Sequence, residues 1–167
     1  MEKLYKIYID GSHMDKQHDG RLGVGGLLVD STKKVPIGEL VSSFSYPLDR
    51  NQIEKSYGTR DCSNPTAELL ALLIALGSFE NILKNRSNKF IVYADYLGVS
   101  KWMNGDWRIK EPYIQKIKKD IDNKITKLNL KGRIAFGWVK GHQEIDLNVD
   151  SYWNAQADLL AKGLIMK

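Results

Sequence analysis

Cysteine is almost absent from this chain of 167 residues, since Cys62 is the only one. A single cysteine cannot form an intramolecular disulfide, and it excludes a zinc site built from several cysteines. A protein without disulfides suits a reducing compartment. We therefore expect a cytoplasmic protein or one that is otherwise intracellular, with the nucleus or an organelle as further possibilities.

Long hydrophobic runs are also missing. The longest, Leu69–Leu76, is far shorter than the roughly 20 apolar residues that cross a bilayer. The amino terminus enters a strand pattern at once and offers no hydrophobic signal-peptide region, so we expect no membrane association. The length favours one domain over residues 1–167, without repeats or linkers. The formal net charge of +5 permits a polyanionic partner.

Alternating apolar residues and turn signals predict five strands, separated in the second half of the chain by helices. The predicted strands are 4–11, 22–30, 37–46, 89–94 and 133–140, and the predicted helices are 64–83, 112–128 and 151–162, with a short helix or turn at 96–103. Segments 47–63 and 141–150 are predicted to be loops. Three consecutive strands followed by alternating helices and strands indicate an α/β fold with a mixed sheet.

Four acidic residues stand at places where a carboxylate is unusual or exposed at an edge. Asp10 and Asp95 end the first and fourth predicted strands, and these carboxylates would lie side by side if the two strands were parallel neighbours. Glu68 lies in the first turn of a helix that is otherwise apolar. Asp158 follows Asn154 by one helical turn, so the two share a face of the last helix.

Carboxylates held close together raise one another's pKa and destabilise the fold unless a cation compensates them. Oxygen ligands without cysteine favour a hard ion such as Mg²⁺ or Mn²⁺. Two such ions about 4 Å apart can stabilise an in-line phosphoryl displacement. The hypothesis that follows is a metal centre for phosphodiester chemistry.

Each acid also has a purely structural interpretation. Asp10 can be a turn residue, and Asp95 can cap the short helix that follows it. Glu68 can be an acid favoured by the helix dipole. Asp158 can pair with Lys162 at helical spacing, which is a weak surface contact.

Five segments, in this order along the chain, resemble the motifs of type 1 ribonuclease H. They are residues 9–12 (IDGS), 64–69 (NPTAEL), 92–95 (VYAD), 138–142 (WVKGH) and 154–161 (NAQADLLA). The resemblance implies a ribonuclease H-like fold, whose five-stranded mixed sheet has the order 3-2-1-4-5 and is flanked by helices. It also implies a hydrolase, an endonuclease that cuts the RNA strand of RNA–DNA hybrids and leaves 5′-phosphate and 3′-hydroxyl ends.

By this resemblance, Asp10, Glu68, Asp95 and Asp158 are catalytic residues that hold two Mg²⁺ ions, with Mn²⁺ as a substitute. In the two-metal mechanism of the family, one ion activates the attacking water and the other neutralises charge on the leaving 3′ oxygen. His142 corresponds to the family's loop histidine, and a neutral-range pKa suits its role in proton transfer or product release.

The resemblance also assigns contacts to nucleic acid. Gly11, Ser12 and Asn64 correspond to groups that recognise the 2′-hydroxyl, which distinguishes RNA from DNA. Trp102 and Trp107 resemble the tryptophans that line the groove for the DNA strand.

The match departs from the family in several places. Tyr96 follows Asp95 where the family usually has serine, and the short segment 104–111 leaves little of the basic protrusion seen in some members. The connections 47–63 and 143–153 are extended. We interpret the other two tryptophans, Trp138 and Trp153, as packing residues.

We expect a monomer that acts on RNA–DNA hybrids, either alone or with a reverse transcriptase or the replication and repair machinery. Two other functions stay open. One is a different nuclease or strand-transfer enzyme on the same fold, such as a resolvase or transposase. The other is a non-catalytic hybrid-binding domain, although such domains usually lose one or more of the acids.

Overall fold

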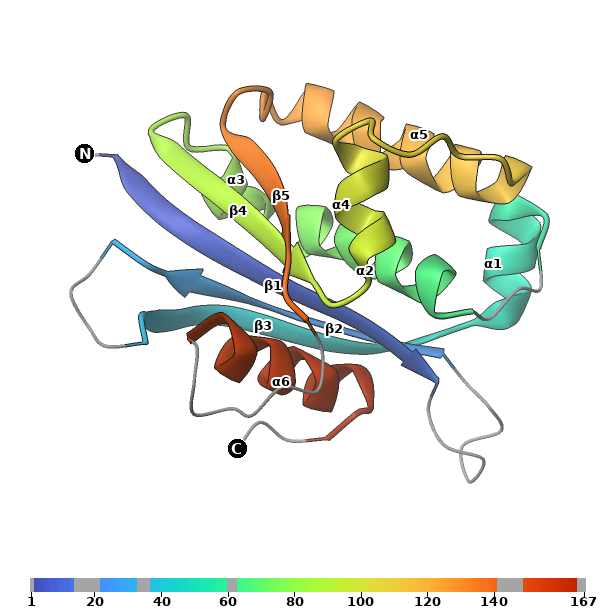
Figure 1. Cartoon of the computed structure of the whole chain (residues 1–167), viewed down its shortest axis with the longest axis horizontal. Helices are drawn as coiled ribbons and strands as arrows, with labels where there is room; N and C mark the ends of the chain where they lie inside the picture. Colours follow the sequence, from blue (N-terminus) through green and yellow to red (C-terminus); the bar gives the residue numbers. More distant parts are fainter. Residues whose placement is uncertain (1, 14–21, 33–36, 60–62, 141–148, 165–167) are drawn as a thin grey trace.

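A mixed sheet forms the centre of the protein. We describe a computed structural model over residues 2–13, 22–32, 37–59, 63–140 and 149–164. Its five strands have the order β3-β2-β1-β4-β5. Helix α6 covers one face of the sheet, and α2 and α5 lie on the other side (Figure 1). Within the described residues, no helix is both long enough and apolar enough to cross a lipid bilayer.

All five predicted strands are confirmed, with ends shifted by a few residues. They are β1 (Lys3–His13), β2 (Leu22–Asp30), β3 (Glu39–Leu48), β4 (Asn88–Ala94) and β5 (Ile134–Trp138). Strand β1 pairs antiparallel with β2 and parallel with β4. The α/β class and the predicted strand order are therefore confirmed.

The helices agree with the sequence patterns in most places. They are α1 (Arg50–Tyr57), α2 (Asn64–Ser78), α3 (Glu80–Leu83), α4 (Leu97–Met103), α5 (Pro112–Lys127) and α6 (Val149–Ala161). The single helix predicted for 64–83 is interrupted at Phe79, which leaves the helical backbone range and is only 3% exposed. Its ring packs on Phe44 of β3 with a centroid distance of 5.6 Å. Helix α6 begins two residues earlier than predicted, so part of the predicted loop is helical.

The prediction that 47–63 is a loop was wrong, because this segment contains α1. The Asp49 side chain accepts a hydrogen bond in the first turn, and Gly58, with a φ of 73°, ends the helix in the left-handed conformation. Ile53 is the only buried side chain on α1. One buried residue produces no apolar periodicity, so only the capping residues marked this helix in the sequence.

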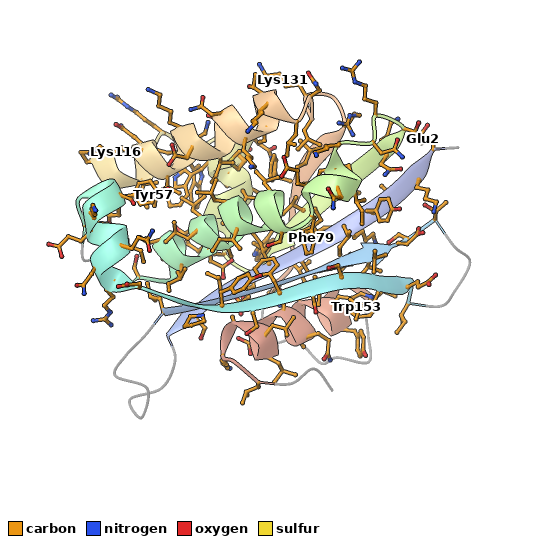
Figure 2. The ribbon with its side chains drawn as sticks, turned by 180° about the vertical axis from the view of Figure 1, so that it is seen from behind. Glu2, Tyr57, Phe79, Lys116, Lys131 and Trp153 are labelled. Carbon is orange, nitrogen blue, oxygen red and sulfur yellow. The ribbon has the colours of Figure 1, made fainter. Side chains whose placement is uncertain are left out.

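Successive residues of β1 serve two cores on opposite faces of the sheet. Ile7 and Ile9 belong to the large core on the α2 side, whereas Tyr8 packs with Trp153 on the α6 side. Figure 2 shows Phe79 and Trp153 on opposite sides of the sheet. Trp153 is 5% exposed, which confirms that it is a packing residue. Because both faces of β1 are covered, Asp10 continues a strand that is buried on both sides.

Arg133, just before β5, joins the ends of two helices. Its guanidinium donates from Nε to the Asn129 carbonyl (3.1 Å), from Nη1 to those of Asn85 and Asn88 (both 3.0 Å), and from Nη2 to those of Leu83 and Leu128 (both 3.1 Å). Leu83 is the last residue of α3, and Leu128 is the C-cap of α5. The planar guanidinium has five N–H donors, and all of them are used on backbone carbonyls.

Arg133→Lys is expected to lower the free energy of unfolding by about 2–3 kcal/mol, because lysine offers fewer donors and no planar fork. Urea denaturation followed by circular dichroism measures this change. Arg86 is an exposed arginine nearby, and Arg86→Lys should change the stability by less than about 0.5 kcal/mol. Equal stability of the two variants would show that the hydrogen bonds of Arg133 contribute little.

Candidate metal centre

The candidate site lies where β4 separates from β1. Their parallel pairing ends at Tyr8 and Tyr93, whereas the pairing of β1 with β2 continues to His13. Asp10 and Asp95 each lie two residues beyond the last parallel pair. The carboxyl ends of parallel strands meet at the same edge of a sheet, so the register places these two residues side by side.

Three carboxylates converge at this point. Single oxygen atoms of Asp10, Glu68 and Asp95 lie within 4.8 Å of one another. Asp10 and Glu68 are 3% and 1% exposed, and Asp95 is half-buried. Oε1 of Glu68 accepts a hydrogen bond from the Gly11 amide at 3.4 Å. Oε2 of Glu68 is buried and finds no hydrogen-bond partner among the described residues, which is costly unless a cation or proton supplies one.

Gly11 lets α2 approach β1 closely enough for Glu68 to join the site. A Cβ atom on Gly11 would lie 2.4 Å from the carbonyl carbon of Ala67 and 2.5 Å from its Cβ atom. Real Cβ atoms do not come so near a backbone carbon. A glycine at this position is therefore a steric requirement of the packing between the strand and the first turn of α2.

On the other face, a second glycine brings α6 to Asp10. Asp10, Gly25 and Ser45 form a row across β1, β2 and β3. A Cβ on Gly25 would lie 2.4 Å from the Ala161 nitrogen, and the Ser45 hydroxyl donates to the Leu160 carbonyl at 2.6 Å. The last turn of α6 thus rests on this row. Gly25 was not among the predicted site residues, although a glycine inside a strand is a known signal of close backbone approach.

Asp158, on α6, lies beside Asp10 but outside the group of three. Asp158 contributes to the raised pKa of Asp10 through a hydrogen bond and through its charge. Its Oδ2 also forms an ion pair with Lys162 Nζ at 2.8 Å. The predicted pairing of Asp158 with Lys162 is therefore confirmed, and this ion pair lies at the edge of the acid site. Asn154, one turn earlier, is buried with its Oδ1 atom unpaired in the described structure.

Burial and mutual repulsion raise the pKa values of two acids of this site. Burial raises the pKa of Asp10 to about 8, with further increases from the charge of Asp95 and from Asp158, while a hydrogen bond with Glu68 acts in the opposite direction. Burial also raises the pKa of Glu68 well above its ordinary value, with added contributions from Asp10 and Asp95. Both shifts express a shortage of positive charge in the protein itself, which a divalent cation would supply.

A comparison with protein families then identifies the chain. The model of the RNase H family matches residues 2–165. The chain belongs to the RNase H family. A comparison with curated protein sequences gives no match.

Solved RNase H structures share this fold. RNase H1 from the halophilic archaeon Halobacterium salinarum NRC-1 is 19% identical, with a TM-score of 0.66 and coverage of 95% of this chain and 94% of the other. LC11-RNase H1, in complex with an RNA/DNA hybrid, is 20% identical, with a TM-score of 0.65 and 96% coverage of both chains. The prototype foamy virus protease-reverse transcriptase is 22% identical at a TM-score of 0.63; the match covers 96% of this chain and 20% of the viral one.

The residues predicted to bind nucleic acid lie in two places. Gly11 and Ser12 follow Asp10 directly on β1, and Asn64 begins α2, the helix that carries Glu68. The predicted catalytic His142 lies outside the described residues.

The two tryptophans predicted to bind DNA line a separate hollow. Trp102 and Trp107 bound a cavity of about 480 Å³, together with Lys118 and Lys119 of α5. Trp102 is half-buried and packs edge-to-face on Tyr96 at a centroid distance of 5.6 Å, whereas Trp107 is 42% exposed. Tyr96, which stands where the family usually has serine, therefore supports one of the predicted groove tryptophans.

The interpretation of Trp138 as a packing residue was wrong, because its side chain is 46% exposed. Trp138 is the last residue of β5, and its indole N–H donates to the Asp95 carbonyl at 2.9 Å. Because Trp138 ends an edge strand, its ring lies outside the core. Its indole hydrogen bond holds the backbone of Asp95, which is an acid of the site.

Trp138→Phe keeps an aromatic ring but removes the donor to Asp95. Because one hydrogen bond contributes about 1 kcal/mol, we expect Mg²⁺ binding to weaken about fivefold, with stability changed by less than about 1 kcal/mol. Calorimetric Mg²⁺ titration measures the affinity. Tyr46→Phe, at an exposed residue of β3, serves as the control. An unchanged affinity in Trp138→Phe would exclude a positioning role.

Proposed function

We propose that this protein is a metal-dependent endoribonuclease that hydrolyses the RNA strand of RNA–DNA hybrids and leaves 5′-phosphate and 3′-hydroxyl ends. The observation that carries the proposal is the convergence of Asp10, Glu68 and Asp95 in a chain of the RNase H family. Buried acids that repel one another destabilise a fold. A cluster of them at the junction of two strands and helix α2 is best explained by a bound cation.

The donor atoms of the site suit Mg²⁺, with Mn²⁺ as a substitute. They are carboxylate oxygens without sulfur, and the unpaired Oε2 of Glu68 is available as a ligand. We propose that Asp10, Glu68, Asp95 and Asp158 hold two ions. When bound, the ions supply the positive charge that favours deprotonation of water and stabilises the leaving 3′ oxygen.

Two hydrogen bonds within the protein hold this arrangement in place. The Gly11 amide orients the carboxylate of Glu68, and the Trp138 indole holds the backbone at Asp95. Such fixed positions reduce the reorganisation that a reaction requires. We propose that His142 assists proton transfer or product release.

Recognition of the hybrid is proposed for two surfaces. Beside the acids, Gly11, Ser12 and Asn64 are proposed to contact the 2′-hydroxyl of the RNA strand. Trp102 and Trp107 are proposed to contact the DNA strand, supported by their shared hollow with two lysines. LC11-RNase H1 was crystallised with an RNA/DNA hybrid, and the foamy virus neighbour is a protease-reverse transcriptase. We propose an intracellular monomer that acts alone or with reverse-transcription, replication or repair machinery.

The test is cleavage of a labelled RNA–DNA hybrid, with double-stranded RNA and a four-way DNA junction as control substrates. We expect cleavage of the RNA strand only, dependence on Mg²⁺ or Mn²⁺, and products whose 3′ ends a polymerase can extend. Turnover in excess chelator would contradict the proposal. Cleavage of the junction would instead support a resolvase-like enzyme, and binding without any cleavage would support a non-catalytic domain.

A further inference from the structure

Lys162 lies directly beyond α6 and turns back onto its last acid. The Lys162 amide donates to the Asp158 carbonyl at 3.1 Å, and Gly163, with a φ of 76°, then ends the helical path. The Lys162 ammonium reaches the Asp158 carboxylate at 2.8 Å. A cation at this position is also favoured by the negative end of the helix dipole.

The charge of Lys162 acts on more than one acid of the site. A hydrogen bond with Asp158 raises the pKa of Lys162 most, and the charges of Asp158 and Asp10 add to this increase. The packing of the last turn of α6 over Gly25, which is paired with Asp10, explains this proximity. Lys162 therefore belongs to the electrostatic surroundings of the metal centre.

The four acids consequently fall into two unequal groups. Asp10, Glu68 and Asp95 converge, and none of the ion pairs described for this structure neutralises them. Asp158 stands next to Asp10 and already has a cationic partner. The side chains of Asp158 and Lys162 are 29% and 44% exposed, so their ion pair is a hydrated contact that another cation can displace.

We propose that Lys162 is a counter-cation built into the site, and that it competes with the metal ion for Asp158. This inference rests on the proposed metal-dependent function. The lysine lowers the affinity of the cation position shared by Asp10 and Asp158, and it leaves the position formed by Asp10, Glu68 and Asp95 nearly unchanged. In the metal-free protein it compensates part of the negative charge and orients the Asp158 carboxylate.

Lys162→Gln tests this competition by calorimetric titration of the full chain with Mn²⁺ and Mg²⁺. We expect the weaker binding event to tighten about fivefold, the upper range for an exposed ion pair, while the tighter event changes less than about twofold. Lys162→Arg keeps the charge and should retain the wild-type affinity. Lys89→Gln is the control, since Lys89 forms an exposed ion pair at 3.0 Å with Glu2, outside the acid site and the proposed nucleic-acid contacts.

A second measurement separates competition for Asp158 from a general change in charge. In Asp158→Asn protein, the additional change Lys162→Gln should have a much smaller effect on metal affinity, because the contested carboxylate is gone and only the weaker interaction with Asp10 remains. Metal-free Lys162→Gln should also unfold about 2 °C below the wild type, since the acids lose a compensating charge. Unchanged or weaker metal binding in Lys162→Gln would overturn the inference.

Hybrid cleavage by the same proteins distinguishes failure of the proposed competition from failure of the proposed function. A wild-type protein that cleaves the hybrid in Mg²⁺ while Lys162→Gln binds metal like the wild type would refute the competition alone. A wild type that binds Mn²⁺ but cuts no hybrid would refute the proposed function and leave the competition measurable. A wild type that binds no metal would overturn both.

Discussion

Asp10→Asn is expected to reduce cleavage of an RNA–DNA hybrid by at least about 10³-fold, because the loss of about 4 kcal/mol of charge stabilisation corresponds to this factor. Asparagine has nearly the same shape and retains one oxygen ligand, but it lacks the negative charge that attracts a divalent ion. Asp10 belongs to the converging group and also stands beside Asp158, since its carboxylate lies within 4.8 Å of those of Glu68 and Asp95 and forms a hydrogen bond with Asp158.

The same change should stabilise the metal-free protein at high pH. The pKa of Asp10 is about 8 in the folded protein and 3.8 when unperturbed. Between these values the folded state binds a proton that the unfolded state has released, so the wild-type stability falls as the pH rises from about 4 to about 8. Asparagine does not ionise, and we expect Asp10→Asn to be about 2 kcal/mol more stable at pH 8, or about 6 °C by thermal unfolding.

Hybrid cleavage in Mg²⁺ and thermal unfolding in chelator, at pH 5 and pH 8, measure both effects. A smaller dependence on pH should remain in Asp10→Asn because the pKa of Glu68 is raised as well. Glu2→Gln is a suitable control, since Glu2 is 63% exposed and pairs only with Lys89 in the described ion pairs. Retained cleavage by Asp10→Asn would point to a contaminating nuclease or to a different catalytic centre.

Gly11→Ala should damage both the fold and the site. The added Cβ would meet the backbone of Ala67 at 2.4 Å, and a backbone atom cannot rotate away as a flexible side chain does. Relief requires β1 and α2 to separate, which we expect to cost about 2–3 kcal/mol of stability. The separation also displaces Glu68 from Asp10, and a misplacement of about 1 Å lowers the cleavage rate by about 10²-fold.

Urea unfolding and kcat on a hybrid substrate test this prediction. Gly77→Ala is a matched control on the same helix, because Gly77 has no atom within 4 Å of a built Cβ. It should be neutral or stabilising by up to about 1 kcal/mol, as alanine is the better helix former. If Gly11→Ala were as stable and as active as Gly77→Ala, close contact between β1 and α2 would not be a requirement of the site.

Local patterns in the chain were sufficient for most of the fold. The apolar residues of the strands and of α5 repeat with the periods of those structures, and turn residues mark their ends. Helix α1 escaped detection because its only buried side chain is Ile53. The interruption at Phe79 escaped detection because it arises from packing on Phe44, which belongs to a distant strand. Both errors concern how a segment packs against distant segments, and such packing produces no repeating pattern in the local sequence.

The site residues divide in the same way. Asp10 and Asp95 were recognisable because aspartate is unusual at the end of an apolar strand, and Glu68 because it interrupts an apolar helix. The position of Trp138 could not be deduced, since its exposure depends on the edge of the completed sheet and its hydrogen bond on the neighbouring strand. The role of Gly25 likewise depends on a helix from the other end of the chain.

From its amino acids alone, the chain specifies the ligand chemistry, which consists of four carboxylates, and the strands and helices that carry them. The assembled fold adds that three of these acids converge in a buried position, whereas Asp158 shares its charge with Lys162. Burial also raises the pKa of Asp10. These properties arise from desolvation and from distances between segments that are remote in the chain, and neither quantity belongs to any residue until the whole structure has formed.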